Sequence, residues 1–262
     1  MSSAEAQPLL EVDRCTIRFG GLTAVSDLTM SIGAGQLFGL IGPNGAGKTT
    51  VFNLITGVYA PTEGEIRFAG QSLARCKPYG ITKCGIARTF QNIRLFPSLT
   101  VFDNVRVAFH LHLKHDATHS LTRFRAFRDE EAQIAAQTMD LLEIFHLGKF
   151  RDAAAKGLSY GDQRRLEIVR ALATRPKLLL LDEPAAGMNA SEKVELMKLI
   201  QFIKDQYKTA VLLVEHDMQV VMSICERIAV LDYGIKIAEG APVEVRRNPK
   251  VIEAYLGEEK NK

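Results

Sequence analysis

The sequence predicts an α/β fold with a mostly parallel core sheet, an antiparallel β patch beside it and an inserted helical subdomain. Three observations support this prediction. Short continuous apolar stretches, such as residues 178–181 and 210–214, alternate with helical patterns and are typical of strands buried on both faces. Short strand-like segments cluster before residue 70, which indicates an antiparallel patch. Residues 92–157 show helical periodicity and no convincing strand.

The individual elements follow from apolar spacing and from the turn residues between them. The expected strands are 9–19, 28–32, 36–41, 65–69, 86–90, 178–181, 211–215, 228–232 and 235–238. The expected helices are 48–55, 101–113, 129–147, 158–172 and 191–207, then a short helix after residue 215 and two short helices near the end. Ser159 is the expected N-cap of the helix over 158–172.

We expect one domain over residues 1–262. The α/β core with its antiparallel patch takes 1–91 and 165–240, the helical subdomain takes 92–164, and a helical tail takes 241–262. Hydrophobic residues make up 47% and charged residues 24% of the chain, which is ordinary globular composition.

Composition also excludes several classes of protein. A net charge of +3 without a long Lys/Arg tract argues against a nucleic-acid partner. The four cysteines are scattered without a CxxC pair, so neither a disulfide framework nor a zinc site is indicated. The N-terminus does not resemble a signal peptide, and no apolar run reaches the roughly 20 residues of a spanning helix. If this protein serves a membrane, we expect it to do so from outside the bilayer.

The stretch GPNGAGKT after an expected strand matches the phosphate-binding pattern GxxxxGK[ST]. Its glycines let backbone N–H groups converge on phosphate oxygens, Lys48 supplies a point charge, and the Thr49 hydroxyl can ligate Mg²⁺. The alternative is a glycine turn with an accidental lysine. The predicted nucleotide-binding residues of this loop are Gly42, Pro43, Asn44, Gly45, Ala46, Gly47, Lys48, Thr49 and Thr50.

Polar side chains follow three other expected strands. In LLLLDEP, Asp182 is placed to hold Mg²⁺ and Glu183 to polarise a water towards the γ-phosphate. His216, in VLLVEHD, could donate a hydrogen bond to that phosphate. Gln91 could touch both the metal and the attacking water. Taken alone, the acidic pair could equally belong to a solvated turn at the end of a strand. Taken alone, the histidine could equally have a structural role.

The helix start LSYGDQ, residues 158–163, is polar and contains Ser159 and Gly161. Backbone N–H groups and the positive end of the helix dipole make such a start suitable for binding an anion.

These motifs, in the order GPNGAGKT, Gln91, LSYGDQ, LLLLDEP and His216, resemble those of the ATP-binding-cassette (ABC) ATPases over nearly the whole chain. The resemblance implies an ATP-hydrolysing motor subunit of a membrane transporter, with ATP and Mg²⁺ bound. It implies that Thr49, Gln91 and Asp182 hold the metal. It also implies that Phe19, in RFGG, stacks on adenine, although a strand-end phenylalanine can also be a core residue.

In this family two cassettes pair head to tail. Ser159 and Gly161 of one chain would then face the γ-phosphate held by the other, which is identical or a second, different ATPase. Cytoplasmic helices of transmembrane permease subunits would contact residues 92–100, where Leu95 and Phe96 lie. The chain would be peripheral on the cytoplasmic face of the inner (plasma) membrane.

Two positions depart from the commonest family pattern. Tyr160 replaces a glycine, and Asn189 replaces an aspartate, which leaves the strength of the cross-dimer contact at Asn189 open. Both departures are similar to the subgroup that energises branched-chain amino acid uptake, as are QRRLEIVRAL, EPAAGMN, EHDM and VIEAYLG. The polar insert at 114–128 resembles that of the larger of the two ATPase subunits in that system. Cassettes for urea or amide uptake and for lipopolysaccharide export are similar to this sequence as well.

Proteins that do not take part in transport share some of these motifs. Soluble ABC proteins of translation or DNA repair usually carry two cassettes or long coiled coils, and this chain shows neither. A nucleotide kinase would lack LSYGDQ and the acidic pair. Just before and within the insert, His112, His115 and His119 suggest either a metal site or a solvated helix end. The basic tract at 123–128 suggests either a lipid contact or an exposed loop.

Overall fold

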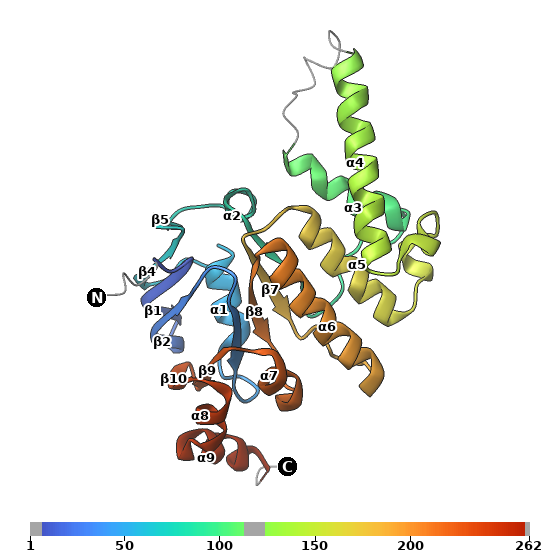
Figure 1. Cartoon of the computed structure of the whole chain (residues 1–262). Helices are drawn as coiled ribbons and strands as arrows, with labels where there is room; N and C mark the ends of the chain where they lie inside the picture. The colour runs from blue at the N-terminus through green and yellow to red at the C-terminus, as the bar shows by residue number, and fades with distance from the viewer. Residues whose placement is uncertain (1–6, 113–123, 260–262) are drawn as a thin grey trace, which may run out of the picture. The chain divides into compact units, whose positions relative to one another are not determined.

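The computed structural model covers residues 1–262 and describes residues 7–112 and 124–259. The chain divides into two compact units (Figure 1). The core unit comprises Met1–Arg88 and Lys177–Lys262, and the helical unit comprises Thr89–Pro176. The sequence-based division placed residues 89–91 and 165–176 with the core, whereas both segments belong to the helical unit.

The central sheet of the core unit has the strand order β10-β9-β3-β8-β7-β6. All neighbours pair in parallel except β10, which is antiparallel to β9, so the predicted mostly parallel sheet is confirmed. Every residue of β3, β7 and β8 is buried, as expected for strands covered on both faces. The strands are β3 (Leu37–Ile41), β6 (Ile86–Arg88), β7 (Leu178–Asp182), β8 (Ala210–Val214), β9 (Arg227–Asp232) and β10 (Ile235–Gly240).

A second, antiparallel sheet with the order β2-β1-β4-β5 forms the predicted β patch. Its strands are β1 (Leu10–Phe19), β2 (Leu22–Ile32), β4 (Glu63–Phe68) and β5 (Gln71–Ser72). Strand β2 begins six residues before the predicted start, because backbone pairing with β1 across a two-glycine turn extends it through residues that lack an apolar pattern.

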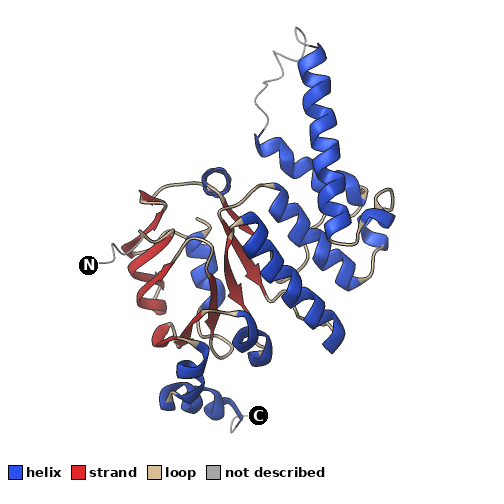
Figure 2. Cartoon of the chain, in the orientation of Figure 1, coloured by secondary structure: helices blue, strands red, loops and turns tan. Residues whose placement is uncertain are grey.

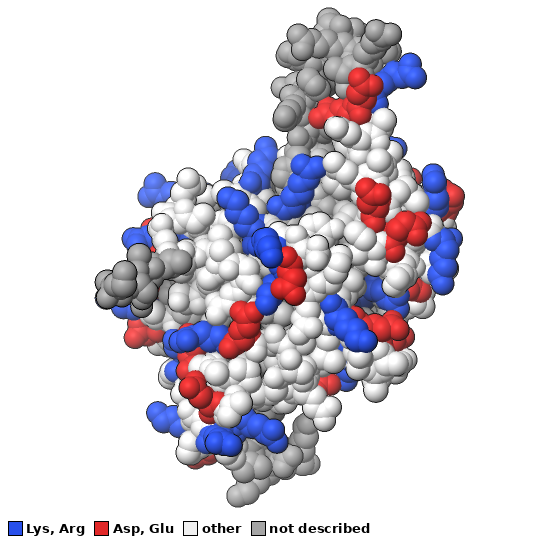
Figure 3. All heavy atoms as spheres, in the orientation of Figure 1, with Lys and Arg blue, Asp and Glu red and all other residues white. Residues whose placement is uncertain are grey.

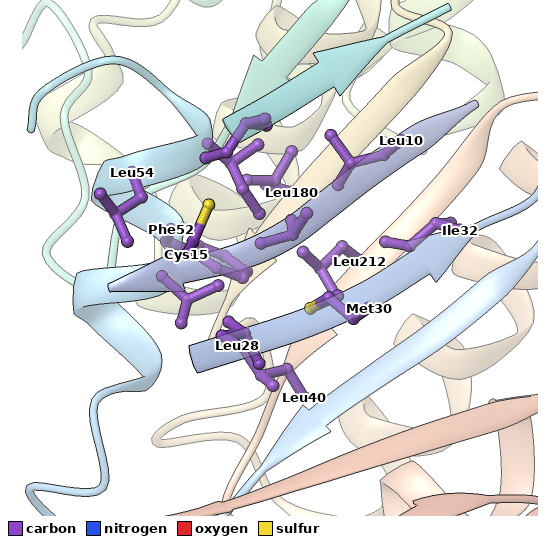
Figure 4. Close-up of a cluster of buried hydrophobic side chains, with 14 of the residues drawn as sticks. Leu10, Cys15, Leu28, Met30, Ile32, Leu40, Phe52, Leu54, Leu180 and Leu212 are labelled. Carbon is purple, nitrogen blue, oxygen red and sulfur yellow. The ribbon is translucent and has the colours of Figure 1, made fainter. Parts of the chain in front are cut away.

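The main core lies between the two sheets and includes helix α1 (Lys48–Ile55) (Figure 4). Alternate residues of the central strands, such as Leu40, Leu180 and Leu212, pack there with Phe52 of α1. The other face of the central sheet is covered by helices. A Cβ atom at Gly39 would lie only 3.0 Å from Val221 of α7 (Met218–Ile224).

The remaining helices of the core unit are α2 (Pro78–Cys84), α6 (Ala190–Tyr207), α8 (Pro242–Arg247) and α9 (Pro249–Glu259). The last two confirm the pair expected at the end of the chain. Helix α2 was not predicted, because Ile81 is its only buried residue and one apolar position produces no periodicity. The predicted strand over 86–90 ends at Arg88.

The helical unit contains α3 (Val101–Phe109), α4 (Phe124–Ile144) and α5 (Tyr160–Ala173) (Figure 2). Short 3-10 helices lie at His110–His112, Gly148–Phe150 and Ala155–Gly157. No strand is present among the described residues of this unit, which confirms that part of the prediction. Helix α5 contacts α3 and α4, which accounts for its place in this unit.

Charges of both signs are mixed on the surface of the protein. Lys and Arg side chains are interspersed with Asp and Glu on the face shown in Figure 3.

The cysteines differ in burial. Burial raises the pKa of Cys15 to about 11 and that of Cys225 to about 12, whereas Cys84 is exposed. Over residues 7–112 and 124–259, no helix is long and apolar enough to cross a membrane.

Candidate functional site

The pairing of three central strands places most of the predicted site at one edge of the sheet. Leu40 of β3 pairs with Val214 of β8, and Val214 pairs with Asp182 of β7. Parallel strands present their carboxyl ends at the same edge. The loop that follows β3, the acidic pair that ends β7 and the histidine that follows β8 therefore share this edge.

The loop between β3 and α1 has the geometry of a phosphate loop. Gly42, Gly45 and Gly47 have φ angles of 150°, 78° and 100°, which side chains disfavour. A Cβ atom at Gly42 would lie 2.1 Å from the carbonyl oxygen of Leu231, so the backbone there leaves no room for one. Among the residues that the structure describes, no side chain caps the first turn of α1. An uncapped helix N-terminus after a glycine-rich loop suits a bound phosphate chain.

Lys48 is the first residue of α1 and is only 6% exposed. Its Nζ donates hydrogen bonds to the carbonyl oxygens of Gly42, at 2.7 Å, and of Pro43, at 2.8 Å. The ammonium group is therefore held against the loop itself. The loop and its lysine fit a nucleotide phosphate.

The acidic pair at the end of β7 divides into two environments. Asp182 is buried, and its Oδ2 lies 2.9 Å from Nη2 of Arg88. Glu183 has a positive φ of 48°, and its Oε1 lies 2.5 Å from Nε2 of His216. The structure thus brings together two of the predicted catalytic side chains, Glu183 and His216.

Glu215 is buried next to His216. It was part of the expected strand 211–215 and was assigned no functional role from the sequence. Its carboxylate accepts hydrogen bonds from the backbone N–H of Ala185, at 2.6 Å, and of His216, at 3.2 Å. Burial raises the pKa of Glu215, and these backbone donors oppose that rise. Glu215 thereby fixes the turn after the acidic pair to the end of β8.

Phe19 ends β1 and is 43% exposed, so it is not a core residue. Its ring meets that of Tyr59 edge to face, with centroids 5.0 Å apart. Tyr59 follows α1 and was not predicted. The exposed face of such a ring is suited to stack on a heterocyclic base.

In the helical unit, Ser159 is the N-cap of α5, as predicted. Its Oγ accepts a hydrogen bond from the backbone N–H of Asp162, at 3.2 Å, and donates one to the Asp162 carboxylate, at 2.7 Å. An acidic side chain therefore already engages the serine hydroxyl at the start of this helix. Gly161 lies in the first turn.

Gln91 is anchored through its backbone to α5. Arg164, fully buried, donates hydrogen bonds to the carbonyl oxygens of Phe90 and Gln91, the latter at 2.7 Å. Glu167 accepts one from the backbone N–H of Arg94, at 3.1 Å, and pairs with Arg164 at 3.0 Å. Sequence reasoning missed this buried pair, although charges three residues apart on an otherwise apolar helix face were a usable signal.

We expect Arg164→Met to lower the free energy of unfolding by about 3–5 kcal/mol, because it leaves the buried carboxylate of Glu167 without its charged partner. Urea unfolding followed by circular dichroism measures the change. Arg165→Met is the matched control, since Arg165 is partly exposed and lies 3.6 Å from Asp162. Equal losses in the two variants would contradict the expectation.

The predicted site residues thus fall in both units. Phe19, the phosphate loop, Asp182, Glu183 and His216 lie in the core unit, and Gln91, Ser159 and Gly161 lie in the helical unit. The side chains of His112, His115 and His119, and those of most of the basic tract at 123–128, are not among those that the structure describes. Where side chains are described, no group of three or more His, Cys, Asp or Glu could hold a metal.

Comparison with known proteins agrees with this geometry. Residues 25–186 match the family model of ABC transporters, and residues 236–261 match a model of branched-chain amino acid ATP-binding cassette transporters. The chain belongs to the ABC transporter family, as an ATP-binding cassette.

Its similar relatives include the high-affinity branched-chain amino acid transport ATP-binding proteins BraF of Pseudomonas aeruginosa and LivG of Escherichia coli K12. They are 46% and 45% identical over 253 residues, or 97% of this chain and 99% of each relative. The lipopolysaccharide export ATP-binding protein LptB of E. coli K12 is 32% identical to this chain, over 92% of this chain and 94% of the LptB sequence. A crystal structure of an ABC transporter cassette in its ADP conformation has a TM-score of 0.83 at 28% identity, covering 96% of this chain and all of that one.

Proposed function

We propose that this chain is the ATP-hydrolysing motor subunit of an ABC importer for branched-chain amino acids, corresponding to the larger of two ATPase subunits. The observation that carries this proposal is the phosphate loop beside the Glu183–His216 pair, in a chain 46% identical to BraF over nearly its full length. The match of residues 236–261 to the branched-chain amino acid transporter model supports the choice of substrate. Lipopolysaccharide export is the weaker candidate, because LptB is only 32% identical.

ATP binding follows from the loop. Lys48 and the backbone N–H groups at the start of α1 would hold the β- and γ-phosphates, and Phe19, with Tyr59 beside it, would hold the adenine. Thr49, Asp182 and Gln91 would hold Mg²⁺, a hard cation that takes hydroxyl, carboxylate and carbonyl oxygens and neutralises charge on the phosphates.

Hydrolysis would be assisted by the Glu183–His216 pair. Glu183 would orient a water towards the γ-phosphate and accept its proton, as a carboxylate at the end of a strand can do. His216 holds that carboxylate at 2.5 Å and would donate to the γ-phosphate once nucleotide is bound. Glu215 keeps both residues in place through the turn that it fixes.

A complete site would need a second cassette, identical or different. Ser159 and Gly161 would face the γ-phosphate held by that partner, and the serine hydroxyl would exchange its bond to Asp162 for one to the phosphate. Asn189, which replaces the usual aspartate, caps α6 in a reciprocal pair with Glu192, so its side chain has a structural role within its own chain.

Coupling to transport would pass through residues 92–100. In this segment Phe96 is 48% exposed, and its backbone N–H and carbonyl are both hydrogen-bonded by the buried side chain of Asn104. A rigid loop that exposes an apolar side chain is suited to receive a helix of a permease subunit. The chain would then lie against the cytoplasmic face of the membrane.

Co-purification from detergent-extracted membranes tests the transporter assignment. We expect multi-spanning subunits in the eluate of the tagged chain, and we expect Phe96→Asp to reduce their yield because it places a charge on the contact. Tyr79→Asp, at an exposed aromatic residue of α2, is the control and should leave the yield unchanged. Ribosomes or DNA in place of membrane proteins would favour a soluble ABC ATPase.

A further inference from the structure

Arg88, the last residue of β6, joins three elements of the core unit through one buried guanidinium group. Its Nη2 lies 2.9 Å from Oδ2 of Asp182 at the end of β7. Its Nη1 donates to the side-chain carbonyl of Asn53 on α1, at 2.7 Å, and lies 3.4 Å from the hydroxyl of Thr56. The guanidinium carbon also lies 5.3 Å from the centre of the Phe52 ring.

The ion pair between Arg88 and Asp182 is closed to solvent, since the two side chains are 7% and 4% exposed. A buried carboxylate is stable as an anion only when charge and hydrogen bonds compensate its desolvation. A planar guanidinium fixes direction as well as charge, because each N–H points along a set line. With Oδ2 bonded to Arg88, the Asp182 carboxylate has a defined orientation at the edge of the sheet.

The other side of the same guanidinium holds α1. This helix carries Lys48 and Thr49 at its first turn, and Asn53 lies on it. Arg88 thus sets the position of the Asp182 carboxylate relative to the helix that follows the phosphate loop. No motif in the sequence marks Arg88 for this role, because its partners come from distant parts of the chain.

We propose that Arg88 is a positioning residue for the Mg²⁺ of bound nucleotide: it orients Asp182 towards the metal and ties that carboxylate to α1. The inference rests on the proposed function, since it concerns the metal that accompanies ATP. Its direct consequence is that removing Arg88 weakens the effect of Mg²⁺ on nucleotide affinity and leaves Mg²⁺-free affinity unchanged.

Calorimetry with a non-hydrolysable ATP analogue, in Mg²⁺ and in EDTA, measures this coupling without turnover. For each variant the quantity is the ratio of the Kd in EDTA to the Kd in Mg²⁺. We expect Arg88→Met to lower the ratio about tenfold, equal to about 1.4 kcal/mol, with the Kd in EDTA unchanged. Asn53→Ala, which removes the anchor on α1, is expected to lower it less. Arg227→Met is the matched control, since Arg227 pairs with Glu239 at 2.7 Å on β9 and β10.

Each other outcome overturns the inference. An unchanged ratio in Arg88→Met, or an equal weakening in Mg²⁺ and in EDTA, would show that Arg88 serves only the packing of α1. If Arg88→Met does not fold, Arg88→Lys and Asn53→Ala test the proposal instead. A lysine keeps the charge of Arg88 but cannot span both partners with a planar fork. If the ratio of Kd in EDTA to Kd in Mg²⁺ is unchanged in both variants, the proposal is rejected. Failure of the unsubstituted chain to bind the analogue would instead reject the proposed function.

Discussion

Glu183→Gln is expected to slow ATP hydrolysis by about 10²- to 10⁴-fold while ATP still binds with its original affinity. Glutamine has nearly the shape of glutamate and can still accept a hydrogen bond from His216, which lies 2.5 Å from the carboxylate. It cannot accept a proton from water, so the proposed base is lost without a change in the binding surface. Phosphate release at saturating ATP measures the rate, and equilibrium titration measures the affinity.

The same variant tests the need for two cassettes. With hydrolysis blocked, ATP should hold the dimer closed, and light scattering should detect it. Adding Ser159→Arg, which places a bulky cation where the partner's γ-phosphate would lie, should abolish this dimer and spare ATP binding.

Glu253→Gln, at an exposed glutamate of α9, is the control for Glu183→Gln and should hydrolyse ATP normally. Rapid turnover by Glu183→Gln would remove Glu183 as the base, and a normal dimer with Ser159→Arg would refute the cross-chain contact.

Lys48→Met is expected to weaken ATP binding by about 2–5 kcal/mol, or about 30-fold to several thousand-fold in Kd, the range for truncating one member of a buried charge pair. Methionine preserves most of the volume at a position that is 6% exposed, so the effect reports the lost ammonium charge. Titration with a fluorescent ATP analogue measures it.

Lys204→Met is the control for Lys48→Met. Lys204 pairs with Glu226 on the surface of the same unit, at 24% side-chain exposure, and its loss should leave the Kd for ATP unchanged. Thermal unfolding of both variants checks that each is folded. If a folded Lys48→Met protein binds ATP with unaltered affinity, Lys48 does not contribute to binding the phosphates.

The sequence was sufficient to predict those parts of the site that are continuous along the chain. The glycine-rich loop and the acidic pair each combine a buried strand with the residues that follow it, so local pattern and site coincide. The N-cap at Ser159 was predictable for the same reason, since a cap is defined by its next three residues.

Contacts between distant residues were not predictable from local patterns. Arg88 and Asp182 are 94 positions apart, and Arg164 and Phe90 are 74 positions apart. Periodicity marks one face of an element as buried but does not say which charge that face will meet. The edge-to-face contact of Phe19 with Tyr59 likewise depends on how β1 and the end of α1 pack.

The unequal environments of the cysteines give the native chain a practical property. Thiolates are the reactive form, and the two buried thiols with raised pKa values remain protonated at neutral pH. Cys84, exposed at the end of α2, is then the preferred attachment point for a maleimide dye in the core unit. A fluorophore placed there, paired with a second one introduced into the helical unit, would report the distance between the two units with and without nucleotide in single molecules.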